Sequence, residues 1–180
     1  MWIVALALAA AVGLGACGQL AQPTSEENDG VYVEAGAVTY QLQVSRELNP
    51  FSVEDREYLR GLPARVATLS PDELWYGVFL WAKNQSSQPQ TTAGNFSITD
   101  TNGDTFHPIP LDPAINGYVW TPIVLGPGGQ QPVPNSTAWW GPTQGALILF
   151  KLPTTVYSNR PLTLQIVSPA GHRGNISLDL

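Results

Sequence analysis

The sequence is poor in the residues that most often carry out catalysis or bind metals, because its 180 residues include one cysteine and two histidines. With Cys17 as the single cysteine, the chain can form no internal disulfide, and its fold must be held by the core. His107 and His172 belong to no zinc-ligand spacing such as HExxH. The G-x-S-x-G motif of many serine hydrolases is also missing. We therefore expect no catalytic residue, no metal and no cofactor.

Charge is scarce as well. Charged residues make up 12% of the chain, with 8 Lys and Arg against 14 Asp and Glu, which gives a formal net charge of −6. Nucleic-acid recognition depends on Lys and Arg side chains that neutralise phosphates, so we expect no nucleic-acid partner. The negative net charge also argues against electrostatic adhesion to anionic lipids. Turn-forming residues are abundant by contrast, with 17 Gly and 16 Pro, and this composition is typical of a loop-rich β protein.

The longest hydrophobic stretch covers residues 2–12 at the N-terminus. It is shorter than the roughly 20 residues of a membrane-spanning helix and has the length of the hydrophobic region of a secretory signal. It ends in Leu14-Gly15-Ala16-Cys17, which resembles the bacterial lipobox, where cleavage falls just before the cysteine. The resemblance implies that the Cys17 sulfur receives a diacylglyceryl group and anchors the protein to the outer face of the cell membrane. The alternative is a free thiol buried in an N-terminal helix.

Three regions follow from this interpretation: a lipoprotein signal peptide at residues 1–16, a flexible tether at 17–36, and one folded domain at 37–180. The tether is predicted because residues 18–30 are polar, contain Pro, Ser and Thr, and show no apolar periodicity.

Within the domain, most segments alternate apolar and polar residues or carry continuous aromatic and branched runs, as strands do. The strands and hairpins are expected at residues 37–45, 74–84, 95–109, 121–125, 146–152, 162–168 and 175–180. The segment 74–84 is apolar on both faces, which predicts a central strand covered on both sides over part of its length. A single short helix is predicted within residues 48–63, with Ser52 as its N-cap.

The hairpin at residues 95–109 contains Asn102-Gly103, a pair that favours a tight turn with positive φ at both residues. Asp100, Asn102 and Asp104 are also spaced like the start of an EF-hand loop. The sixth and twelfth positions would be Thr105 and Leu111 instead of Gly and Glu. A turn held by side-chain bonds to the local backbone is therefore favoured over a weak surface calcium site.

Seven to eight strands with turns between them, one short helix and no βαβ alternation predict an all-β protein. The fold class expected is an antiparallel Ig-like β-sandwich without a disulfide.

The order of motifs along the chain resembles the extracytoplasmic Ig-like domains of unknown function found on bacterial, especially actinobacterial, lipoproteins. These domains are akin to the secreted mycobacterial immunogenic antigen sandwich. The matching pieces are a strand that ends in Asn at residues 78–84, an F-x-I-x-D-x-x-G motif at 96–103 and a turn of the L-x-P-G type at 125–128. An apolar strand that ends in Pro follows at 147–153, and a final hairpin begins with residues 162–167. The resemblance implies a fold and assigns no catalytic residue.

Aromatic residues in the Pro- and Gly-rich segment 110–144 are the best candidates for a binding surface. They are Tyr118, Trp120, Trp139 and Trp140. Tryptophan and tyrosine combine a large contact area with a polar group and are favoured at interfaces. The adjacent Trp139 and Trp140 could stack on a sugar ring or on a proline of a partner, or they could plug the open end of the sandwich.

The predicted function is that of a lipid-anchored, extracytoplasmic interaction module that contacts an envelope protein and performs no catalysis. Two alternatives stay open. One is a receptor for a carbohydrate or other small ligand that uses the loop tryptophans, and the other is a purely structural envelope protein.

Overall fold

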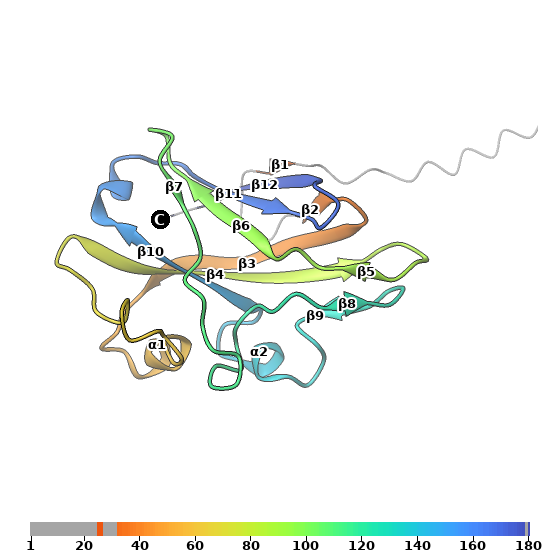
Figure 1. Cartoon of the computed structure of the whole chain (residues 1–180), viewed down its shortest axis with the longest axis horizontal. Coiled ribbons are helices and arrows are strands. Elements are labelled where there is room, and N and C mark those ends of the chain that lie inside the picture. The colour runs from red at the N-terminus through yellow and green to blue at the C-terminus, as the bar shows by residue number, and fades with distance from the viewer. Residues whose placement is uncertain (1–24, 27–31, 179) are drawn as a thin grey trace, which may run out of the picture.

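The computed structural model describes residues 25–26, 32–178 and 180, and the predicted signal peptide and Cys17 lie outside these residues. Two β-sheets pack against each other (Figure 1). Sheet A contains β1 (Ser25–Glu26), β12 (Arg173–Leu178), β11 (Leu162–Val167), β6 (Asn95–Thr99) and β7 (Thr105–Phe106), in that order. Sheet B contains β10 (Ala146–Pro153), β4 (Glu73–Asn84), β3 (Val38–Leu48) and β2 (Tyr32–Ala35), and β9 (Gln130–Gln131) pairs with the end of β4.

The antiparallel sandwich predicted from the sequence is confirmed. Every strand pairing is antiparallel except that of β1 with β12, and the small third sheet joins β5 (Gln90–Thr91) to β8 (Val124–Leu125). Among the residues that the structure describes there are twelve strands, and seven of these have four or more residues; six of the seven overlap predicted segments, and β2 was not expected. The described helices are α1 (Val53–Tyr58), α2 (Thr137–Trp140) and a 3₁₀ turn at Thr154–Tyr157, and none is long and apolar enough to cross a membrane.

The main core lies between the two sheets, and β4 contributes to it through alternate residues. Tyr76, Val78 and Leu80 are buried on the inner side of β4, while Trp75 and Phe79 belong to a second cluster on the outer side. The second cluster is covered by α1 and by residues 109–119, so the prediction of a strand buried on both faces over part of its length is confirmed.

The alternation within residues 37–45 predicts that Tyr40, Leu42 and Val44 share one face of β3, and Tyr40 and Leu42 are indeed buried in the main core. The prediction is wrong for Val44, because the register of β3 against β4 shifts between Leu42 and Val44. A bulge of this kind reverses the side chains that follow it. Val44 therefore packs against the second cluster, on the outer side of the sheet.

The predicted tether is wrong at its C-terminal end. Residues 32–35 form β2, in which Val33 and Ala35 are buried in the main core, and a turn with Gly36 at φ 78° leads into β3. Burial of two alternate apolar side chains outweighs the polar character of the segment. Residues 25–26, also within the expected tether, pair with β12.

Two further expectations need correction. In the β6–β7 hairpin Gly103 has a positive φ, of 89°, and Asn102 does not, because the Asp100 side chain accepts the N–H groups of Asn102 and Asp104 and holds a wider turn. The helix α2 was not expected at all. It begins after Ser136, whose hydroxyl accepts the N–H of Trp139 at 3.3 Å, in a segment where Pro and Gly obscure the helical signal.

Candidate functional site

Trp120 lies in the main core and is not an exposed loop residue, although its edge also lines the apolar groove beside β10. Its side chain is 8% exposed and packs edge-on against Phe96, with ring centroids 5.5 Å apart. Its indole N–H donates to the carbonyl of Ala93, and the Ala93 N–H donates to the Tyr40 hydroxyl at 2.7 Å. The N–H and the C=O of the buried Ala93 thus both form hydrogen bonds with aromatic side chains. Burial raises the pKa of Tyr40 to about 12, although the Ala93 hydrogen bond acts in the opposite direction.

Tyr118 is also a packing residue. It is half-buried in the second cluster, where its ring meets Tyr58 of α1 edge-on at 4.8 Å. Burial raises the pKa of its hydroxyl. Its carbonyl accepts the N–H of Leu147, which fastens residues 109–119 to the free edge of β10. Tyr118 therefore holds the loop in place over sheet B.

Trp139 and Trp140 are brought together with a third tryptophan that the sequence did not indicate. Helix α2 places the ring of Trp139 on Trp81 of β4, with centroids 4.6 Å apart and planes tilted by 35°. The ring of Trp140 stands nearly at a right angle to that of Trp139, and its side chain is 70% exposed. Figure 1 shows α2 on the outer side of sheet B, beside α1. Trp139 thus covers part of the sheet, while Trp140 faces solvent.

A hollow of about 210 Å³ lies on the half of the outer face that α1 does not cover, and of the three tryptophans Trp81 alone lines it. It is lined by side chains from four strands, which are Tyr32, Thr39, Gln41, Trp81, Ala82, Lys83 and Gln130. The register explains why they meet. Tyr32, Gln41 and Trp81 are directly opposite one another across β2, β3 and β4, and Thr39, Lys83 and Gln130 form the next row. We call the hollow together with Trp139 and Trp140 the open patch.

Two polar atoms at the hollow have no hydrogen-bond partner among the described residues. They are the hydroxyl of Thr39, whose side chain is buried with 3% exposure, and the indole nitrogen of Trp81. An unpaired buried polar group costs about 1–3 kcal/mol. Groups of this kind in a native fold call for an explanation.

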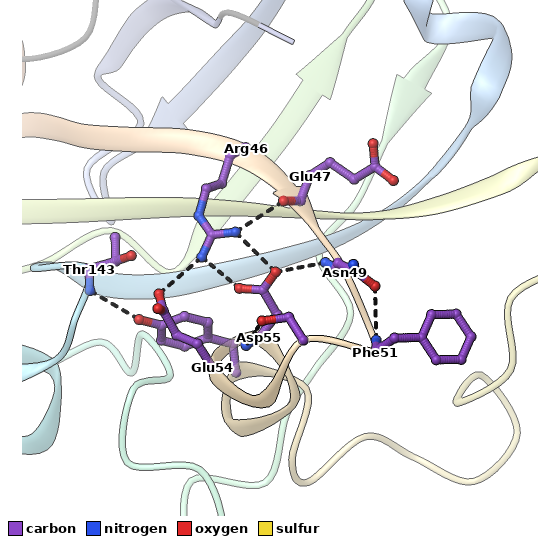
Figure 2. Close-up of polar contacts among 9 residues, drawn as sticks. Arg46, Glu47, Asn49, Phe51, Glu54, Asp55 and Thr143 are labelled. Carbon is purple, nitrogen blue, oxygen red and sulfur yellow. Dashed lines mark hydrogen bonds and ion pairs between the residues drawn. The ribbon is translucent and has the colours of Figure 1, made fainter.

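The largest charged network lies elsewhere and serves to hold α1 on the sheet. Figure 2 shows the guanidinium of Arg46, from β3, facing the carboxylates of Glu54 and Asp55 in the first turn of α1. Arg46 donates to both oxygens of Asp55, at 2.6 and 3.1 Å, and the Asn49 N–H donates to the same carboxylate at 2.8 Å. The carboxylates of Glu54 and Asp55 are therefore both paired with Arg46.

Loss of this network gives a prediction for acid stability. Burial by itself raises the pKa of Asp55, but the hydrogen bonds from Arg46 and Asn49 and the Arg46 charge together lower it below 3.8. The stabilisation is therefore present above pH 3.8, the ordinary pKa that Asp55 has in the unfolded chain. It is lost as the pH falls through the lower pKa that Asp55 has in the folded protein. Arg46→Met should cost about 2 kcal/mol at pH 7, less than the roughly 3–5 kcal/mol of a fully buried pair, because the Arg46 side chain is 32% exposed.

Urea unfolding at pH 7, 5 and 3 measures this effect. The free energies of unfolding of the wild type and Arg46→Met should converge toward the lowest pH, because protonated Asp55 needs no cation. A difference that stays constant over this range would contradict the assignment. Arg65→Met is the control, because Arg65 is absent from the ion pairs found among residues 32–178.

The remaining candidates from the sequence are explained locally. Asp100 accepts two backbone N–H groups in its turn and the amide of Asn159 at 2.9 Å, so its carboxylate is satisfied within the hairpin region. His107 lines an apolar groove beside β10, whereas His172 lies in the β11–β12 loop near Gly36. Over residues 25–26, 32–178 and 180, no three His, Cys, Asp or Glu side chains are grouped to hold a metal ion.

The fold and the site define a disulfide-free, two-layered antiparallel β-sandwich with an aromatic and polar patch on one outer face. No protein-family model and no curated protein matches the sequence. Solved structures do match. The yjhA protein of Bacillus subtilis is similar over 85% of this chain and 99% of its own, with a TM-score of 0.56 and 12% identity.

Two further structures have the same architecture. One is ycdA of Bacillus subtilis subsp. subtilis strain 168, described as a candidate lipoprotein, with a TM-score of 0.52 and 8% identity. The match covers 84% of this chain and 39% of ycdA. The other is a protein of unknown function from Listeria monocytogenes, with a TM-score of 0.50, 12% identity, and coverage of 83% and 80%. At such identities the likeness establishes the fold, and the resemblance to actinobacterial lipoprotein domains stays a prediction.

Proposed function

We propose that this protein is a membrane-anchored, extracytoplasmic binding module without catalytic activity, and that the open patch is its binding surface. The observation that carries the proposal is the exposure of Trp140 beside the stacked Trp139 and Trp81. A large exposed aromatic ring is typical of the anchoring residues of interfaces, and Trp139 and Trp81 connect this ring to the hollow. The ligand is a component of the cell envelope.

The anchor is the lipid on Cys17. Ser25, the first described residue, pairs with Asn175 of β12 and follows Cys17 by eight residues, so the segment between them spans at most about 28 Å. The domain would therefore stay within reach of the membrane and of the material just outside it. The description of ycdA as a candidate lipoprotein, on the same fold, agrees with this placement.

The binding surface is tested by replacing Trp140 with alanine. The full chain, purified in detergent, is mixed with envelope fragments of its own cells that have been extracted free of lipid, and the bound fraction is measured by sedimentation. We expect Trp140→Ala to bind at least about tenfold more weakly, the loss of a single anchoring side chain. Its free energy of unfolding should change by less than about 0.5 kcal/mol, because the side chain is exposed.

The matched control is Phe51→Ala. Phe51 is 91% exposed and lies before α1, away from the open patch, so this change removes an exposed aromatic ring without touching the proposed site. Equal binding by wild type, Trp140→Ala and Phe51→Ala would refute the proposed surface. Absence of binding by all three would refute the proposed function.

A further inference from the structure

We infer that the ligand of the open patch is a neutral carbohydrate of the cell envelope. This inference rests on the proposed function and names its ligand class. It is carried by the two unpaired polar atoms at the hollow, by the aromatic rings beside it and by the balance of charge around it.

The two unpaired atoms favour a ligand with closely spaced hydroxyl groups. The Trp81 indole nitrogen can donate a hydrogen bond and accept none, whereas the Thr39 hydroxyl can do both. A sugar offers several groups that donate and accept within a few ångströms of one another. The amide side chains of Gln41 and Gln130 line the same hollow and have the same double capacity.

The rings supply the apolar part of the recognition. A pyranose presents C–H groups on one face and hydroxyls around its rim, so it can stack on an aromatic ring and still form hydrogen bonds at its edge. Trp140 offers an exposed ring on one side of the patch, and Tyr32, 48% exposed, offers a second on β2. Ligand sites combine aromatic walls with a few polar groups that set orientation in this manner.

An extended peptide fits this surface less well. The patch lies on the face of sheet B, where β3 is paired with β2 and β4, and β4 with β9, so the backbone groups of these strands serve the sheet. A peptide that binds by adding a strand needs a free edge instead. An anionic polymer is also disfavoured, because Lys83 at the hollow is offset by Glu34, which lies opposite Thr39 in the same row.

Access to the two unpaired atoms requires a small side-chain movement. Both atoms are shielded from solvent, and the residues around them include long flexible side chains, of which Lys83 is exposed. A change of rotamer in such a side chain costs little, and the inference requires that one of these changes opens the way to the two atoms. The sugar hydroxyls then replace the missing partners.

Thr39→Val is the discriminating variant. Valine has the shape of threonine and favours strands, but it lacks the hydroxyl. Because this hydroxyl has no partner in the described part of the chain, its removal should raise the melting temperature by about 3 °C. Binding to the delipidated envelope fragments should weaken by about tenfold through loss of the ligand hydrogen bond.

The ligand class is tested on the same fragments after two treatments. Protease digestion should leave binding intact, and periodate, which cleaves the vicinal diols of sugars, should abolish it. Thr163→Val, the same substitution on β11 of the other sheet, is the matched control and should bind like the wild type.

The outcomes separate the two proposals. Binding that is lost after protease and kept after periodate overturns the carbohydrate inference and leaves the binding module standing, with a protein as its ligand. Unchanged affinity of Thr39→Val also overturns the inference, since the hydroxyl would then contact no ligand. Fragments that bind no form of the protein overturn the proposed function itself.

Discussion

Replacing Trp120 with alanine is expected to lower the free energy of unfolding by about 4 kcal/mol, the usual cost of removing a large aromatic side chain from a core. Trp120 fills the space between Tyr40 and Phe96, and its indole N–H satisfies the carbonyl of Ala93. The variant loses the buried apolar area of the indole, leaves a cavity and leaves the Ala93 carbonyl without its hydrogen-bond donor. Domains of this size have total stabilities of about 5–15 kcal/mol, so the loss is a large share of the whole.

The measurement is urea unfolding followed by circular dichroism, with a melting temperature about 12 °C below that of the wild type. The melting temperature of Trp120→Phe should lie between those of the wild type and Trp120→Ala, because phenylalanine keeps most of the apolar area but loses the hydrogen bond to Ala93. Trp140→Ala is the surface control and should unfold like the wild type. If Trp120→Ala matched Trp140→Ala in stability, the placement of Trp120 in the core would be wrong.

Replacing Cys17 with serine is expected to move the protein almost completely from the membrane fraction to the soluble fraction. The proposed diacylglyceryl group is attached through sulfur, which serine lacks. Each buried methylene of an acyl chain contributes about 0.8 kcal/mol to membrane attachment, so loss of two chains removes the anchor. The net negative charge of the sequence offers no electrostatic substitute.

Cell fractionation with immunodetection measures this effect, and mass spectrometry of the membrane-bound wild type should find an N-terminal Cys17 that carries the lipid. Gln19→Ala, two residues further along, is the control and should stay in the membrane fraction. Membrane association that is unchanged in Cys17→Ser would contradict lipidation. An unmodified thiol on the mature wild type would contradict it as well.

Local patterns predicted much of the fold. Alternation identified β3, a run of aromatic and branched residues identified β4, and Ser52 correctly marked the start of α1, because these signals are encoded by neighbouring residues. The errors arose where a local rule was overridden. The shift in β3 moved Val44 to the outer face, and pairing with β3 drew residues 32–35 into the sheet. The side chain of Asp100 selected the wider turn.

The candidate site was predicted in part. Trp139 and Trp140 do belong to the open patch, whereas Trp120 and Tyr118, from the same segment, pack in the two cores. Composition cannot separate these four residues, because an exposed and a buried tryptophan look alike in a Pro- and Gly-rich loop. Trp81 lies in the run that predicted β4, but its contact with Trp139 depends on α2, which the sequence did not reveal.

By itself, the sequence determined that this is an all-β chain without disulfides and which residues of its principal strands are apolar, since period and composition are properties of neighbours along the chain. The tertiary structure decided which aromatic residues meet and which polar groups are left unpaired. Thr39, Trp81 and Gln130 come together through the strand register, and Trp139 joins them when α2 docks on the sheet. These are contacts between distant segments, and their energies depend on packing and desolvation that arise when the two sheets and their covering loops assemble.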